Sequence, residues 1–147
     1  MPMTAADYRD SLRRYSPRVF VDGERIDSVV DAPSLQPGIN ALGVTYDMAL
    51  REELAPIMQA VQASSGKTVN RMLHVDQSSG DLLNKLEAVR VLCQETGCAQ
   101  RYLAHDAFSA LTQTTARIDA DKGTAYGERF AAYMHDFQDK DLSVTSP

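Results

Sequence analysis

The chain has 147 residues, of which 44% are hydrophobic and 24% charged, as expected of one globular domain. Its formal net charge of −5 argues against nucleic acid as the main partner, because binding to phosphates needs a basic surface. No stretch approaches the roughly 20 apolar residues of a membrane-spanning helix and no secretory signal opens the chain, so we expect a cytoplasmic protein that contacts no membrane.

The first predicted helix covers residues 5–15. Thr4 is a good N-cap, and Asp7 stands three residues further on, an arrangement close to a capping box. Pro17 ends this helix, because proline does not continue a helical hydrogen-bond pattern.

A short β-hairpin is predicted next, at residues 19–26. Apolar residues alternate there on both sides of Asp22 and Gly23, a pair that favours a tight hairpin turn. A hairpin of this size is not stable alone, so we expect it to pack on helices. Residues 31–38, with two prolines and a glycine, form a surface loop.

Helical spacing of apolar residues returns over residues 39–62, where Pro56 is expected to divide the helix. Residues 64–66, two serines and a glycine, then end the helical pattern. The pair Gly66 and Lys67 is typical of a phosphate-binding loop, but such a loop needs a glycine five residues earlier, where Val61 stands. We therefore predict a plain turn between helices.

The strongest helical pattern begins near Ser79 and ends at Gly97. One apolar stripe is formed by Leu82, Leu86, Val89 and Cys93. The stripe places Cys93 in the core, whereas Cys98 stands at the start of the next helix, where the positive end of the helix dipole would favour a thiolate. On one continuous helix these two thiols would point about 140° apart, which disfavours a shared metal.

Two further helices complete the prediction. The first covers residues 99–120, with Leu103, Ala107, Ala110, Leu111 and Ile118 facing inward, and Thr124 caps the second. The inward face of the last helix would comprise Tyr126, Phe130, Tyr133 or Met134, and Phe137. The predicted class is therefore all-α, mainly helical, with one short β-hairpin.

The histidines suggest one polar cluster. His74 and His135 are predicted at the surface, whereas Arg101, Tyr102 and His105 fall within about one helical turn of each other. Spacing alone leaves two interpretations open, a binding site or an ordinary polar helix face.

The sequence also resembles a known family. Segments at residues 3–8, 11–12, 18–20, 23–26, 66–71, 90–101, 106–110, 123–126 and 141–142 resemble, in the same order, the N-terminal domain of the 4-hydroxyphenylacetate 3-hydroxylase / 4-hydroxybutyryl-CoA dehydratase (vinylacetyl-CoA isomerase) flavoenzyme family. The resemblance covers nearly the whole chain.

The resemblance implies a domain organisation. Residues 1–142 would be the helical N-terminal domain, as in acyl-CoA dehydrogenase-like flavoenzymes, and residues 143–147 a polar tail that starts the linker to a missing β-domain. FAD would be bound mainly by the β-domain and a C-terminal helix bundle. The implied partners are a protein that carries those parts, or further copies of this chain, and a flavin reductase.

The resemblance also implies site residues. Arg90, Gln100 and Arg101 match positions near the family's active site, and with Tyr102 and His105 they form the expected substrate-binding set. A guanidinium there would bind a carboxylate, a phenolate or a phosphate.

The dehydratase branch uses a [4Fe–4S] cluster with two cysteines, four residues apart, in this domain. Cys98 matches the first, but the second position is Tyr102, and a phenol is a poor substitute for a thiolate at such a cluster. Cys98 is thus a metal ligand only if a cluster is retained, and we do not expect one.

The resemblance predicts the N-terminal domain or a split subunit of an FAD-dependent enzyme, inactive alone. A two-component phenol hydroxylase is the first expectation, because the second cluster cysteine is absent. Part of a 4-hydroxybutyryl-CoA dehydratase/vinylacetyl-CoA isomerase is the second, and a non-catalytic binding or scaffold module the third. A large exposed apolar patch would favour a split subunit over a module.

Overall fold

The computed structural model describes residues 2–98 and 101–144, and these residues are mostly helical. The helices are α1 (Ala5–Tyr15), α2 (Gln36–Leu50), α3 (Ala55–Met58), α4 (Ser79–Thr96), α5 (Tyr102–Lys122) and α6 (Tyr126–Asp139), with a 3-10 helix η1 (Arg71–Leu73). The strands form two antiparallel pairs, β1 (Val19–Val21) with β2 (Glu24–Ile26) and β3 (Gln59–Val61) with β4 (Thr68–Asn70). No helix in the described ranges is long and apolar enough to span a membrane.

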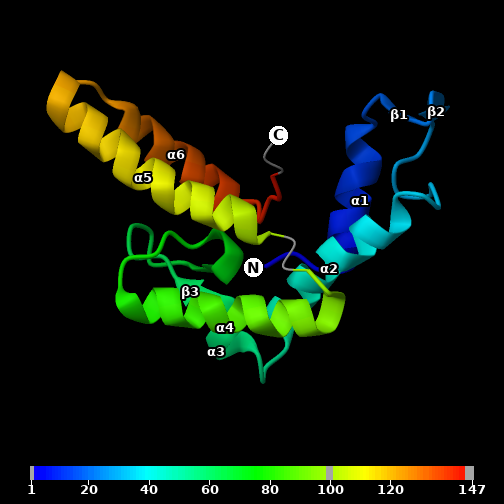
Figure 1. The fold of residues 1–147 in the computed structure, drawn as a ribbon, viewed down its shortest axis with the longest axis horizontal. Coiled ribbons are helices and arrows are strands. Elements are labelled where there is room, and N and C mark those ends of the chain that lie inside the picture. The colour runs from blue at the N-terminus through cyan, green and yellow to red at the C-terminus, as the bar shows by residue number, and fades with distance from the viewer. Residues whose placement is uncertain (1, 99–100, 145–147) are drawn as a thin grey trace.

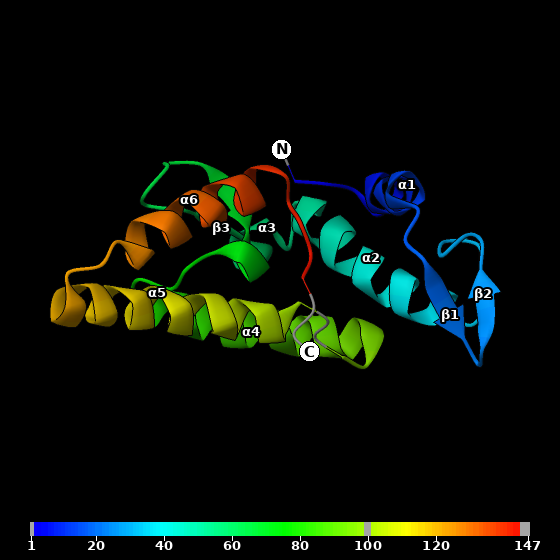
Figure 2. The ribbon, with the colours of Figure 1, turned by 90° about the horizontal axis from the view of Figure 1, so that it is seen from above.

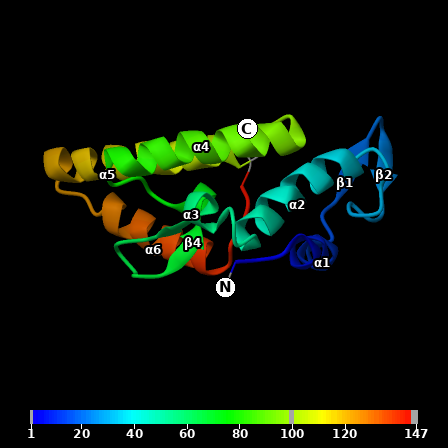
Figure 3. The same ribbon diagram turned by 90° about the horizontal axis from the view of Figure 1, so that it is seen from below.

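The helices form two groups. Figure 1 shows α5 and α6 side by side with α4 below them, while α1 and α2 project to the opposite end and carry the β1–β2 hairpin. The view from above separates the same two groups (Figure 2). From below, α3 and β4 lie in the middle (Figure 3), where α3 contacts α4 and β4 contacts α6.

The hydrophobic core consists of two clusters that meet at η1. Met72 belongs to the first cluster, together with buried residues of α2, α3 and α4, and Leu73 belongs to the second, with buried residues of α5 and α6. Their neighbour Arg71 is also buried and donates hydrogen bonds to the carbonyl oxygens of Ile57 and Gln59. This short helix therefore joins the two halves of the fold.

The α1–α2 pair is held by a close helix crossing. A Cβ atom on Gly43 of α2 would lie 3.1 Å from Cβ of Ala5, so a larger residue would push α1 away. Beside this crossing the rings of Tyr8 and Tyr46 stack with centroids 5.2 Å apart. The crossing fixes the position of Tyr46, which reappears in the site below.

Several local predictions are confirmed. Thr4 and Asp7 form a reciprocal capping box on α1, which has the predicted bounds. The β1–β2 hairpin turns at Asp22 and Gly23, both with positive φ. Helix α4 begins at Ser79 and ends at Gly97, which adopts the left-handed conformation at φ 74°.

The helical stretch predicted at residues 39–62 is divided near Pro56 as expected, but its second part is mostly not helical. Helix α2 ends at Leu50, Pro56 lies in the first turn of the four-residue α3, and β3 follows at once. The predicted turn between helices at residues 64–66 is instead the turn of a second hairpin, β3–β4, with Gly66 at φ +66°. Strands of three residues give too short an alternation to be recognised in the sequence.

The predicted inward faces of α4 and α5 are largely wrong. The buried residues of α4 are Lys85, Ala88 and Leu92, whereas Leu82, Leu86 and Cys93 of the predicted stripe are exposed and Val89 is half-buried. On α5 the buried residues are Ala104, His105 and Phe108. On α6 the prediction is mostly confirmed, because Met134 and Phe137 are buried and Phe130 is half-buried against them, whereas Tyr126 is exposed. Large apolar side chains are consequently exposed, among them Leu82, Leu83 and Leu86 on α4 and Leu103 and Leu111 on α5.

Candidate functional site

A cluster of charged and polar side chains lies between α4 and the start of α5. Its members, here called the charged cluster, are Asp76, Lys85, Tyr102, His105 and Asp106. Nζ of Lys85 lies 2.9 Å from Oδ1 of Asp106 and 3.5 Å from Oδ2 of Asp76. The latter oxygen accepts a hydrogen bond from Nε2 of His105 at 3.0 Å. Three separate segments therefore supply one network.

Burial and opposite charge compete in this cluster. Burial acts to lower the pKa of Lys85, but the hydrogen bond and the charge of Asp106, with the charge of Asp76, outweigh it and raise this pKa. Burial acts to raise the pKa of Asp106, yet hydrogen bonds from Lys85 and Tyr102 hold it below the usual value. The ammonium of Lys85 also lies 5.8 Å from the ring centroid of Tyr102. Lys85 and Asp106 are thus each held in the charged form, chiefly by one another.

Next to this cluster, the side chain of Arg101 is buried against Tyr46 of α2 and residues 141–142, which follow α6. This side chain is 2% exposed, and Nη2 donates to Oδ1 of Asp141 at 2.8 Å and to the carbonyl oxygen of Leu142 at 2.7 Å. The guanidinium lies 4.4 Å from the ring centroid of Tyr46, whose hydroxyl is 2.7 Å from Oγ of Ser143. Arg101 thereby links α5 to α2 and to the segment after α6.

Several buried polar atoms at the start of α5 have no hydrogen-bond partner in the described part of the chain. They are Nε and Nη1 of Arg101, Nδ1 of His105 and Oδ1 of Asp76. An unpaired buried polar atom is costly, so such atoms commonly mark the place of a ligand or an ordered water. The two guanidinium nitrogens are donors and suit an acceptor such as a carboxylate, phenolate or carbonyl oxygen.

The structure brings together three of the predicted substrate-binding residues and separates a fourth. Arg101 and His105 are buried and Tyr102 is half-buried at the start of α5. Arg90 is exposed on α4, where it bonds with Glu87 and donates to Gln94 at 2.9 Å. The remaining predicted residue, Gln100, lies outside the described residues.

The prediction of His74 as a surface residue is wrong. Its side chain is 3% exposed, and its Nδ1 lies 3.1 Å from Oε1 of Gln62, which also accepts from Gln138. His135, by contrast, is exposed as predicted.

The sequence analysis missed Asp76, Lys85 and Asp141 as site residues. One of them carried a usable signal, because Lys85 stands three and seven residues before the buried Ala88 and Leu92, on the same helix face. The two aspartates carried none, since they lie outside helices and reach the site only through tertiary folding.

The thiols do not form a metal centre with these groups. Cys93 and Cys98 are both exposed, and the described residues contain no group of three His, Cys, Asp or Glu side chains placed to hold a metal ion. Tyr102, which stands at the position of the second cluster cysteine, carries a phenol that hydrogen-bonds with Asp106. The described residues therefore do not fit an iron–sulfur cluster by themselves.

Comparison with known proteins gives closely related folds. The chain is 40% identical over 145 residues to 4-hydroxybutyryl-CoA dehydratase/vinylacetyl-CoA-Δ-isomerase of Clostridium aminobutyricum. It superimposes on an oxygen-tolerant archaeal 4-hydroxybutyryl-CoA dehydratase of N. maritimus with a TM-score of 0.92 and 38% identity. The oxygenase component (HpaB) of 4-hydroxyphenylacetate 3-monooxygenase shares the fold at a TM-score of 0.77 and 18% identity.

The chain matches only part of the length of each relative. The alignments cover 98%, 97% and 99% of this chain but only 30%, 28% and 31% of the three relatives in turn. The family model described as 4-hydroxyphenylacetate 3-hydroxylase N terminal matches residues 4–146. The chain therefore belongs to the 4-hydroxyphenylacetate 3-hydroxylase N-terminal domain family.

Proposed function

We propose that this chain is the N-terminal domain or a split subunit of an FAD-dependent enzyme and is inactive alone. The observation that carries the proposal is the coverage, because the chain matches its relatives along almost its whole length yet spans about 30% of theirs. The remaining parts, reached through a linker that starts at residues 143–147, would hold most of the flavin. The exposed leucines of α4 agree with a surface that another domain or subunit covers.

In this proposal the start of α5 forms the wall of the substrate site. Nε and Nη1 of Arg101 are preoriented donors, because Nη2 is fixed by Asp141 and the ring of Tyr46 lies against the guanidinium. They would bind an acceptor oxygen of the substrate or flavin. His105, held by Asp76, and the half-buried Tyr102 would border the same space and exclude water from it.

Dehydration of a hydroxyacyl-CoA is the reaction that the comparisons favour, because identity to two dehydratases is 40% and 38%, against 18% to the oxygenase. In that reaction the exposed Arg90 would exchange its bonds with Glu87 and Gln94 for a CoA phosphate. Phenol hydroxylation by reduced FAD from a separate reductase, the first expectation from the sequence, becomes the second candidate. It is favoured by Tyr102, which stands where a second cluster thiolate would be needed.

The test is to purify the chain from its native source and to identify bound proteins by mass spectrometry, with a visible spectrum and an iron assay. A yellow complex with a protein that carries the β-domain and helix bundle is the expected result. Stoichiometric iron with a broad iron–sulfur absorbance would favour the dehydratase, and its absence the hydroxylase. A colourless, stably folded chain without partner or flavin would overturn the proposal and leave a binding or scaffold module.

If the purified complex is an active enzyme, substitution of Arg101 tests whether this residue lines the substrate site. Arg101→Lys keeps a cation beside Asp141 but loses the planar donors, so KM for the substrate should rise roughly tenfold or more. Arg9→Lys is the matched control, because Arg9 lies on α1 and donates to the side chain of the exposed Asn40. An unchanged KM in Arg101→Lys would remove Arg101 from the substrate site without affecting the assignment as an enzyme part.

A further inference from the structure

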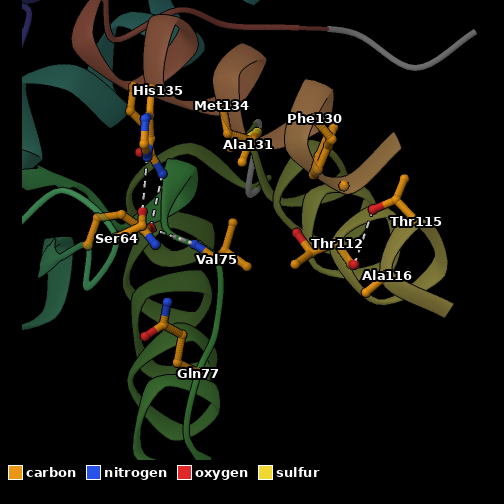
Figure 4. Close-up of a pocket in the computed structure, with 13 residues that line it drawn as sticks. Ser64, Val75, Gln77, Thr112, Thr115, Ala116, Phe130, Ala131, Met134 and His135 are labelled. Carbon is orange, nitrogen blue, oxygen red and sulfur yellow. Dashed lines mark hydrogen bonds between the residues drawn. The ribbon is translucent and has the colours of Figure 1, made fainter. Parts of the chain in front are cut away.

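A second hollow lies away from the charged cluster. It is a pocket of about 290 Å³ between α5, α6 and residues 62–77, and Figure 4 shows its lining. Its lining residues on α5 begin at Thr112, about two helical turns beyond His105. The pocket is therefore separate from the substrate site proposed at the start of α5. Ligand binding in this pocket does not depend on the proposed function.

Short side chains keep this pocket open. Ala116 of α5 and Ala131 of α6 both line it (Figure 4), as does Gly127, the second residue of α6. A Cβ atom on Gly127 would lie 3.0 Å from Oδ2 of Asp119, so a larger residue there would displace this carboxylate. The side chains between the two helices are thus too small to fill the space.

The inner surface of the pocket is mainly apolar, with a polar end at Ser64 and His135 and further polar groups from Gln77, Thr112 and Thr115. Val75, Phe130 and Met134 supply apolar walls. At the polar end, Oγ of Ser64 lies 3.1 Å from Nε2 of His135, both from exposed residues that could turn toward a ligand. The lining residues, all in the described part of the chain, include no Asp, Glu, Lys or Arg.

We propose that this pocket binds a small uncharged molecule with one or two fused rings and a single hydrogen-bonding group. The volume is about twice that of a 150 Å³ cavity known to accept benzene, so a bicyclic ring fits. A carboxylate or ammonium on the ligand would lose water without meeting an opposite charge, which selects against charged molecules. The hydrogen-bonding group of the ligand pairs with Ser64 or His135.

Indole is a suitable probe, because it is neutral, has two fused rings and carries one N–H donor. The protein contains no tryptophan, so indole fluorescence excited beyond the tyrosine band reports only the probe. We expect saturable binding with a Kd of roughly 10 µM to 1 mM, the range open to a ligand of this size. Indole-3-carboxylate, with the same rings and a negative charge, should bind at least about tenfold more weakly.

Ala131→Leu fills the pocket and should weaken indole binding roughly tenfold or more, since the ligand and the new side chain compete for the same volume. Ala132→Leu is the matched control on the adjacent exposed position of α6, which does not line the pocket, and should leave Kd within about twofold. Should Ala131→Leu lose helical circular dichroism, Ala116→Leu performs the same test from α5.

Three results would overturn the proposal. The first is no saturable binding of indole, and the second is equal binding to folded Ala131→Leu and Ala132→Leu, which would place the probe elsewhere. The third is binding of indole-3-carboxylate as tightly as indole, which would reject the uncharged class of ligand.

Discussion

His74 shows how a single residue acquires its properties from tertiary contacts. Three atoms meet at Oε1 of Gln62, namely Nδ1 of His74, the backbone N of Val75 and Nε2 of Gln138, at 3.1, 3.2 and 3.0 Å. Because a carbonyl oxygen only accepts, we infer that Nδ1 carries the proton. Nε2 lies 3.4 Å from Oδ1 of Asp81. Burial lowers the pKa of His74, although Asp81 opposes the shift.

From this lowered pKa we expect the free energy of unfolding to fall as the pH drops from about 7.5 to about 5. Unfolded His74 takes up a proton near pH 6.5, whereas the folded protein does so only at lower pH. Between these values the unfolded state binds more protons, so acid favours unfolding. Urea unfolding at several pH values should show a flatter dependence for His74→Gln, while the exposed control His135→Gln keeps the parent slope. Equal slopes in His74→Gln and the parent would contradict this account.

The site residues differ in how far the sequence could reveal them. Spacing within one helical turn predicted that Arg101, Tyr102 and His105 lie together, but it left open whether they form a binding site or a polar helix face. Asp76 and Asp141 were missed because each contacts α5 only after distant segments fold together, 29 and 40 residues away in the chain. A pairwise contact of this kind leaves no periodic trace in a single sequence.

At the scale of elements, the start of α6 is capped from the preceding helix and not by the predicted Thr124. Oδ1 of Asp119 accepts hydrogen bonds from the backbone N of Tyr126 at 2.8 Å and from the hydroxyl of Thr124, and Oδ2 accepts one from the backbone N of Gly127 at 2.7 Å. Hydrogen bonds from Thr124, then Gly127, hold the pKa of Asp119 below its usual value. One carboxylate therefore fixes the turn between α5 and α6.

Asp119→Ala should fray the first turn of α6, because its backbone N–H groups lose their acceptors. Amide hydrogen exchange at Tyr126 and Gly127 should become about fivefold faster, and the thermal midpoint should fall. Asp121→Ala is the control, since Asp121 is exposed and pairs with its neighbour Lys122. Unchanged exchange at Gly127 in Asp119→Ala would mean that the cap does not hold the helix.

Helix bounds were more predictable than helix faces, for a physical reason. Caps and tight turns depend on residues adjacent in sequence, and those of α1, β1–β2 and α4 were recovered. The face of α4 was not, because the buried Lys85 is stabilised by Asp76 and Asp106 while the leucines of the apparent apolar stripe stay exposed. A pattern of hydrophobicity cannot distinguish apolar residues that enter the core from apolar residues that stay exposed on a helix.

At the scale of the whole molecule, α4 carries a connected apolar surface. Leu82, Leu83 and Leu86 are 46%, 67% and 58% exposed, and their spacing makes them neighbours on the helix. If the chain is part of a larger flavoenzyme, covering these side chains would supply on the order of 1.5–3 kcal/mol each, enough to dominate docking of the missing part.

The double variant Leu83→Lys with Leu86→Lys should therefore fold like the parent, because both side chains already face solvent, but should retain at least about tenfold less of the partner protein in co-purification. Phe20→Lys on the β1–β2 hairpin is the control, since Phe20 is 59% exposed at the other end of the molecule. Loss of the partner in Phe20→Lys alone would move the docking surface to the hairpin. Retention of the partner in both variants would show that neither apolar surface holds the partner. The exposed leucines of α4 would then no longer be interpreted as a surface that another domain or subunit covers.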